Sequence, residues 1–145
     1  MRDGGRLAAV FDAIASECEE IGRPFAAPTR IPNTNRALRA LELVRAMAPE
    51  AHEALEEALY RATWVEGLAI DDPDVLDGLI GLAGAPNKDV RASLDGGGGS
   101  AELATSMAEA HRAGVAATPA WAFGEFVLPG VQPRALYERI VSKLA

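Results

Sequence analysis

The stretch GVAATPAWAFG, residues 114–124, is the part of this sequence that decides the fold. It contains a short apolar run at residues 120–123, and a second run follows at residues 126–128, across Gly124-Glu125. Two such runs joined by a two-residue turn predict a β-hairpin, which Pro129-Gly130 ends. Because a sheet of two strands is marginal on its own, we expect something else to cover or extend this hairpin.

Upstream of the hairpin, apolar residues recur at spacings of three and four, the period of a helix with one buried face. Residues 22–32 contain three prolines and are expected to form an extended connector. The predicted helices cover residues 7–21, 33–48, 49–66, 71–84, 87–94 and 100–114, and a last one covers residues 133–144. The predicted fold class is therefore α/β and mostly helical: six helices, the hairpin and one more helix, without an internal repeat.

Individual residues mark the ends and faces of these helices. Asp72-Pro73 predicts the start of a helix whose apolar row includes Leu82. Asn87 is the expected cap of the next helix, and Met107 is expected to face inward from the helix that Ser100 begins. The acidic residues around position 72 are explained as helix-start residues, so we assign them no chemistry.

Length and composition bound the class of protein. At 145 residues and 15.2 kDa the chain fits one ordinary domain. Apolar residues make up 49% and aromatic residues 6%, which favours a helical core built mainly from Ala and Leu. The net charge of −7 offers no attractive field to phosphate backbones, so we expect no nucleic-acid partner. No apolar stretch approaches the ~20 residues of a membrane span, and we expect a cytoplasmic protein without a membrane partner.

The single cysteine, Cys18, limits the redox chemistry of the chain. One cysteine cannot form an intrachain disulfide, a CxxC pair or a cysteine-rich zinc site. Cys18 lies on the apolar face of the first predicted helix, where a buried structural thiol is expected. Its neighbours Glu17, Glu19 and Glu20 disfavour a thiolate. We therefore expect no redox activity from the chain alone, because an unpaired thiol cannot complete a dithiol cycle.

Two other motifs invite a chemical interpretation that their surroundings do not support. The glycine run at residues 96–99 precedes a helix, but no Lys follows it and no strand precedes it, so a flexible joint is expected rather than a phosphate loop. His52 begins a partial zinc-protease motif whose second histidine position holds Glu56, and His111 stands alone. We therefore expect no metal.

The Thr118-Pro119 bond has two interpretations. A cis bond before a buried strand exposes the backbone of the preceding residue at the sheet edge, where an extended peptide or a thiol can pair with it. A trans proline simply begins the strand. The dipeptide alone favours the trans form, since cis is the minority isomer.

The order of segments in this chain resembles a known family. Residues 114–124 are similar to the cis-proline segment of DsbA-like proteins, in a layout that resembles the C-terminal half of a thioredoxin fold. Residues 30–37, RIPNTNRA, are similar to the entry into the helical insert of that fold, and residues 59–67 and 70–76 match the insert further along. Over nearly its whole length the chain resembles the DsbA-like group, which includes 2-hydroxychromene-2-carboxylate isomerases and kappa-type glutathione transferases.

The resemblance implies a partial thioredoxin-like fold in one domain spanning residues 1–145. Residues 22–113 correspond to the helical insert, and residues 114–145 to the cis-proline loop, the hairpin and the terminal helix. Family members begin with a strand, a CxxC or a catalytic Ser at the start of the first helix, and a second strand. We expect this N-terminal βαβ segment to be missing here, so no catalytic residue is carried over.

The resemblance also implies a binding site. Ala117, Thr118 and Pro119 form the loop that faces the nucleophile in the family, where the backbone before the proline binds a thiol or a substrate. Asn33, at the entry of the insert, lies near the substrate cleft in the family. The resemblance changes our expectation for the Thr118-Pro119 bond to cis. It implies no cofactor, although glutathione or another low-molecular-weight thiol fits as a ligand.

Three functions stay open at this point. The first is a DsbA-family thiol–disulfide oxidoreductase or isomerase that lacks its CxxC segment and is inactive alone. The second is a glutathione-dependent isomerase or transferase of the 2-hydroxychromene-2-carboxylate isomerase type. The third is a non-catalytic module that binds a partner or itself.

Because the unpaired strand edge is a template for association, we expect a homodimer completed by hairpins or N-terminal segments. A surrogate strand at residues 24–32 is the lesser alternative.

Overall fold

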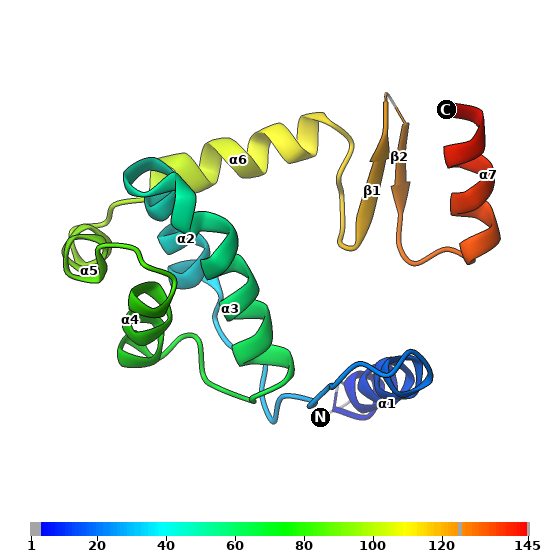
Figure 1. Ribbon diagram of the computed structural model, residues 1–145, viewed down its shortest axis with the longest axis horizontal. Coiled ribbons are helices and arrows are strands. Elements are labelled where there is room, and N and C mark those ends of the chain that lie inside the picture. Colours follow the sequence, from blue (N-terminus) through cyan, green and yellow to red (C-terminus); the bar gives the residue numbers. More distant parts are fainter. Residues whose placement is uncertain (1–3, 125, 145) are drawn as a thin grey trace. The chain divides into compact units, whose positions relative to one another are not determined.

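The computed structural model describes residues 4–124 and 126–144 of the chain, which divides into two compact units, Met1–Ser100 and Ala101–Ala145 (Figure 1). The first unit contains α1 (Gly4–Glu20), α2 (Asn35–Met47), the 3-10 turn η1 (Pro49–Ala51), α3 (His52–Trp64), α4 (Pro73–Leu82) and α5 (Asn87–Asp95). α6 (Ser100–Arg112) leads into the second unit, which contains β1 (Ala120–Phe123), β2 (Phe126–Pro129) and α7 (Arg134–Leu144). The predicted mostly helical α/β class is confirmed, and the described residues contain no strand before β1.

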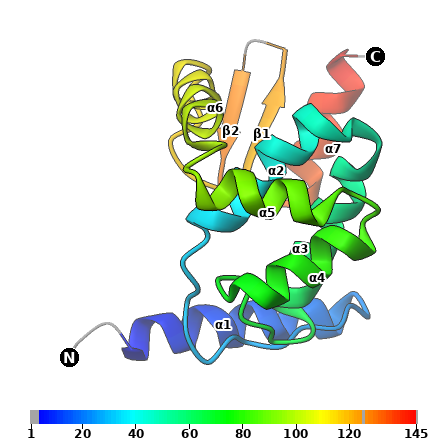
Figure 2. The same cartoon turned by 90° about the vertical axis from the view of Figure 1, so that its left-hand side faces the viewer.

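Four helices enclose the core of the first unit. α2 contacts α3 and α5, and α4 contacts α3 and α5, which closes a ring that Figure 2 shows from the side of α5. The fully buried large side chains in this ring are Val44, Leu55, Leu76, Ile80 and Val90. The apolar period of the sequence identified the buried face of α3, which carries Leu55, Leu59 and Ala62. On α2 it was right only in part, since Val44 of the predicted row is buried but Leu38 of the same row is 41% exposed.

Leu82 departs from the predicted apolar row, since its side chain is 85% exposed. The buried residues of α4 are Leu76, Leu79 and Ile80. Successive helical residues turn by about 100°, so Leu82, two positions after Ile80, lies about 200° away from it around the helix. The row therefore ends at Ile80.

The start of α4 follows the sequence prediction, whereas the start of α5 does not. Asp72 caps α4 by accepting a hydrogen bond from the Asp74 backbone N–H at 2.9 Å, and Pro73 is the first helical residue. At α5 the cap position is Pro86, whose carbonyl accepts from the Val90 N–H at 3.0 Å. The expected Asn87 cap is therefore wrong by one residue.

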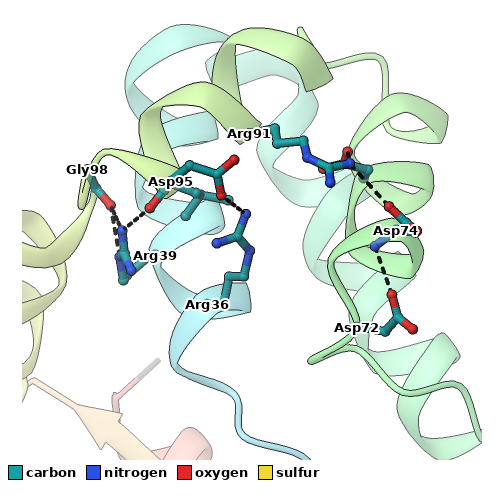
Figure 3. A network of polar contacts seen from close by, with 9 residues as sticks. Arg36, Arg39, Asp72, Asp74, Arg91, Asp95 and Gly98 are labelled. Carbon is teal, nitrogen blue, oxygen red and sulfur yellow. Dashed lines mark hydrogen bonds and ion pairs between the residues drawn. The ribbon is translucent and has the colours of Figure 1, made fainter.

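The predicted flexible joint at the glycine run is wrong, because the run is a packed turn. Arg39 of α2 donates from Nε and Nη2 to the Gly98 carbonyl at 2.8 and 2.7 Å, and from Nη2 to the Leu94 carbonyl at 2.8 Å (Figure 3). Gly99 is buried with φ +78°, and a Cβ built there would lie 2.6 Å from the Arg39 carbonyl oxygen. Only glycine fits this position, so the run joins α5 to α6 through a defined contact with α2.

The first helix is attached through aromatic rings. The centroid of Phe11 on α1 lies 6.4 Å from that of Phe25 and 6.1 Å from that of Trp64. Phe25 stacks on Trp64 with centroids 6.2 Å apart, and the Ala26 N–H donates to the Trp64 carbonyl at 2.7 Å. The proline-containing connector is thus packed against the end of α3, and α1 is packed against both.

The second unit is built around the predicted hairpin, which is confirmed. β1 and β2 are antiparallel, with Ala120 opposite Pro129 and Phe123 opposite Phe126. Tyr137 of α7 packs against one face of the hairpin through Trp121, with ring centroids 5.2 Å apart, and Phe123. The Tyr137 hydroxyl also accepts a hydrogen bond from the Gln132 N–H at 3.1 Å.

The second unit buries few side chains. Leu103 is buried, but Met107, one turn later on α6, is 63% exposed, so its predicted inward position is wrong. α7 has no buried residue in the part that is described. The two strands and α7 are too few elements to enclose a core of their own.

No helix in the described ranges 4–124 and 126–144 combines the length and the apolar character that a membrane crossing requires.

We predict that Gly99→Ala lowers the free energy of unfolding by about 3 kcal/mol, through a left-handed backbone and overlap with the Arg39 carbonyl. Gly97→Ala is the matched control, because Gly97 also has a positive φ but open space around its Cβ position. Gly97→Ala should lower the free energy of unfolding by about 1 kcal/mol. Urea unfolding of both variants measures the difference, and equal losses would contradict the packed turn.

Candidate functional site

The residues 117–119 lie where α6 leads into β1. α6 ends in a hydrogen-bonded turn: the Val115 N–H donates to the Ala110 carbonyl at 3.0 Å, and the Gly114 N–H donates to the His111 carbonyl at 3.0 Å. Gly114 has φ +87°, the left-handed conformation that this helix end requires. The chain then leaves the helix sharply and passes into the loop before the hairpin.

The loop itself is open to solvent. Ala117, Thr118 and Pro119 are all exposed, and the Thr118-Pro119 peptide bond is cis. The Pro119 carbonyl accepts a hydrogen bond from the Gly130 N–H at 2.8 Å, which continues the ladder between the strands by one step. The loop is therefore anchored at its last residue by the sheet.

The same hydrogen bond determines which edge of β1 is free. In an antiparallel pair, hydrogen-bonded and non-hydrogen-bonded residue pairs alternate. Because Pro119 is bonded to Gly130, the next pair, Ala120 with Pro129, is a non-bonded one, and so is Ala122 with Val127. The N–H and C=O groups of Ala120 and Ala122 consequently point away from β2. In the described part of the chain the sheet has two strands, so this edge of β1 has no strand beside it.

Asn33 lies in the first unit, just before α2, and it is exposed. Its backbone N–H donates to Asp71 Oδ2 at 3.2 Å, and its side-chain Oδ1 accepts from the Asn35 N–H at 3.1 Å. Thr34, at the N-cap position of α2, makes no side-chain cap hydrogen bond, and the Asn33 side chain takes that role from one position further out. The structure thus brings Ala117, Thr118 and Pro119 together in the second unit and holds Asn33 within the first.

Asp71 is a residue to which the sequence assigned no chemistry. Its carboxylate accepts from both terminal nitrogens of Arg30, at 2.6 and 2.7 Å, and its side chain is only 19% exposed. The Arg30 guanidinium lowers the pKa of Asp71 to about 2, chiefly through the hydrogen bond, and the Asn33 N–H contributes in the same direction. The sequence contained a signal for a second role: Asp71 and Asp72 are adjacent, and a helix N-cap needs only one carboxylate, so the other is available for a different contact.

Cys18 is half-buried rather than fully buried, which corrects the sequence expectation. It lies on α1, where only the Phe11 side of the apolar face is covered by other rings, and Leu7 and Ile14 remain exposed. The chain has no other cysteine. Cys18 therefore has no partner within the chain for a disulfide.

The two histidines do not build a metal site. His52 accepts a hydrogen bond at Nε2 from Arg45 Nη2 at 3.1 Å, and Arg45 is also paired with Glu42. His111 lies at the end of α6. No group of three potential ligands is close enough to hold a metal ion among the residues that the structure describes.

Comparison with known proteins assigns the family. The family model of the DSBA-like thioredoxin domain matches residues 3–141, so this chain belongs to the DSBA-like thioredoxin domain family. That family is one of thiol–disulfide oxidoreductases and isomerases. No curated protein matches the chain.

We predict that Asp71→Asn destabilises the protein at neutral pH and that this difference disappears in acid. The carboxyl group has a pKa of about 3.9 in an unfolded chain and of about 2 in the fold. Because the folded pKa is the lower one, the stabilisation is present above about pH 4 and is lost as the pH falls towards 2.

Urea unfolding of wild type and variant at pH 7, 4, 3 and 2 measures this. Asp74→Asn is the control, because the Asp74 carboxylate is 87% exposed where it meets Arg91, and such surface pairs contribute little. If the difference in the free energy of unfolding between wild type and Asp71→Asn stays constant down to pH 2, the ion pair with Arg30 does not stabilise the fold through the Asp71 carboxylate.

Proposed function

We propose that this chain is a binding member of its family that takes a low-molecular-weight thiol such as glutathione, or an extended cysteine-containing peptide, at Ala117-Thr118-Pro119. The observation that carries the proposal is the exposed loop that continues into the open edge of β1. A ligand with a peptide backbone can pair with the outward N–H and C=O groups of Ala120 and Ala122 as an added strand.

The remaining parts take the roles that the family implies. Residues 22–113 are the helical insert, and residues 114–145 are the loop, the hairpin and the terminal helix of the thioredoxin-like part. Asn33 belongs to the insert, at the position that lies near the substrate cleft in the family. These assignments are supported by the family match over residues 3–141.

The chain alone performs no dithiol chemistry in this proposal. A thiol–disulfide cycle needs an attacking and a resolving thiol. Cys18 is the one cysteine of the chain, so the chain holds no second thiol to resolve a mixed disulfide. The protein therefore binds the thiol ligand without oxidising it.

We predict that glutathione, titrated into ¹⁵N-labelled protein, shifts the backbone signals of residues 117–122. Ala120→Pro should weaken binding about fivefold, because it removes one outward N–H donor and leaves the β1–β2 hydrogen bonds in place. Ala120→Ser keeps that N–H and is the matched control. Insulin reduction by the same samples should stay at background and be unaffected by Cys18→Ser.

A comparison of glutathione with a cysteine-containing peptide separates the branches of the family. Binding of glutathione but not of a cysteine-containing peptide favours the glutathione-dependent isomerase or transferase branch, and binding of the peptide favours the oxidoreductase branch. Signals that do not move with either ligand at millimolar concentration would end the proposal.

A second role, self-association, is favoured by a separate observation. The aromatic side of the hairpin is poorly covered, since Phe126 is 79% exposed and Trp121 is 48% exposed. Val141 and Leu144 of α7 are exposed as well. Apolar surface of this kind, next to an open strand edge, marks an interface. We infer a symmetric homodimer in which the β1 strands of two copies pair, with the small side chains of Ala120 and Ala122 at the contact. Dimer and ligand use the same edge of β1, so the two exclude each other.

We predict a dimer in light scattering at micromolar concentration and a monomer for Ala122→Pro. Proline at this non-bonded position removes an outward N–H without breaking the hairpin. Ala122→Thr keeps the N–H and suits a strand, so it should stay dimeric. A stable, folded wild-type monomer would refute the dimer.

A further inference from the structure

The two edges of the hairpin, β1 and β2 in Figure 1, differ in what they offer to another strand. Ala120 and Ala122 of β1 turn their backbone groups outward, because their pairs with β2 are non-bonded. The residues opposite them, Pro129 and Val127, likewise turn their backbone groups away from β1. Each alanine presents both an N–H and a C=O at the β1 edge, whereas one of the two outward positions on β2 is a proline.

At Pro129 the outward backbone groups of β2 are missing or occupied. Proline has no backbone N–H, and the Pro129 carbonyl accepts a hydrogen bond from Gln132 Nε2 at 2.9 Å. Because a carbonyl can only accept, the nitrogen of the Gln132 amide must face it, which settles the orientation of that side chain. Val127 is then the one outward residue of β2 that keeps both groups for a new strand. A proline on an edge strand is one of the means by which sheets avoid further pairing.

Gln132 is itself held by α7. Its backbone N–H donates to the Tyr137 hydroxyl at 3.1 Å, and the Tyr137 ring packs against Trp121 with centroids 5.2 Å apart. The segment between β2 and α7 is therefore fixed at Gln132, and from there the side chain returns to Pro129. The hydrogen bond to the Pro129 carbonyl thus starts from a backbone that the hairpin and α7 hold together.

We propose that Pro129 and Gln132 block the β2 edge, so that self-association through β1 ends at two copies. This inference rests on the homodimer of the proposed function and adds what limits its size. When two β1 strands pair, the joined sheet has β2 of each copy at its two outer edges. An open outer edge would pair with the next dimer and continue into a filament, whereas a blocked edge leaves a closed assembly. The partner that fits the hairpin is therefore one second copy of the chain.

The test opens the β2 edge and follows the assembly by light scattering and sedimentation. Pro129→Thr restores an outward N–H with a residue that suits a strand, and Gln132→Ala frees the carbonyl. The double variant should form species larger than a dimer, whose mean mass rises with protein concentration. Wild type should stay at twice the mass of one chain. Pro133→Thr is the matched control and should also stay dimeric, because Pro133 lies between β2 and α7, outside the sheet.

Adding Ala122→Pro to the double variant shows which edges take part. This third substitution removes an outward N–H of β1 and leaves β2 as the open edge, so the triple variant should stop at a dimer. Near-UV circular dichroism reports whether Trp121 and Tyr137 still pack in each variant. If the double variant is unfolded, Gln132→Ala alone, which changes no strand residue, should show the same growth to a smaller extent.

The possible failures differ from one another. A wild-type monomer refutes the homodimer and the inference with it. A dimeric wild type whose folded double variant also stays dimeric refutes the inference and leaves the homodimer standing, and so does a dimeric Gln132→Ala where the double variant is unfolded. Growth beyond a dimer in the Ala122→Pro background overturns the inference as well, because the copies then meet through a surface other than the two strand edges.

Discussion

The guanidinium of Arg39, bound to the carbonyls of Leu94 and Gly98, is the interaction on which the order of the first unit depends. The last turn of α5 ends in carbonyl groups without helical partners, and a cation there is favoured by the direction of the helix dipole. Arg39 supplies both the donors and the charge from α2. The contact joins residues of α2 and of the end of α5 that are 55 and 59 positions apart in the sequence.

Periodic and local features of the fold were accessible from the sequence. The apolar period identified the four core helices, and the Asp72-Pro73 pair gave the start of α4 because a cap and a first-turn proline act within three residues. The hairpin followed from two apolar runs and their turn. Each of these depends on neighbours in the chain, which is the information that a single sequence carries best.

Features that depend on distant partners were not accessible. Arg39 and Gly98 are separated by 59 residues. The sequence therefore predicted a flexible joint at the glycine run, although its glycines pack against α2. Arg30 and Asp71 are separated by 41 residues, and neither residue stands out by itself. The exposure of Met107 has the same origin, since helical spacing says which residues share a face but not whether anything covers that face. Ala117-Thr118-Pro119 and Asn33 came from resemblance to a family, because an exposed loop and an exposed amide carry no periodic signal.

The cluster of Phe11, Phe25 and Trp64 has a consequence for how the protein opens. Three aromatic pairs, each contributing on the order of 1 kcal/mol beyond the area they bury, connect α1 and the connector to α3. The enclosed core of α2, α3, α4 and α5 is independent of them. Segments tied by few contacts open at lower free energy than the core around which they lie. Within the first unit, α1 is therefore the element expected to exchange its amide hydrogens first by local unfolding, with Trp64 fluorescence reporting the event.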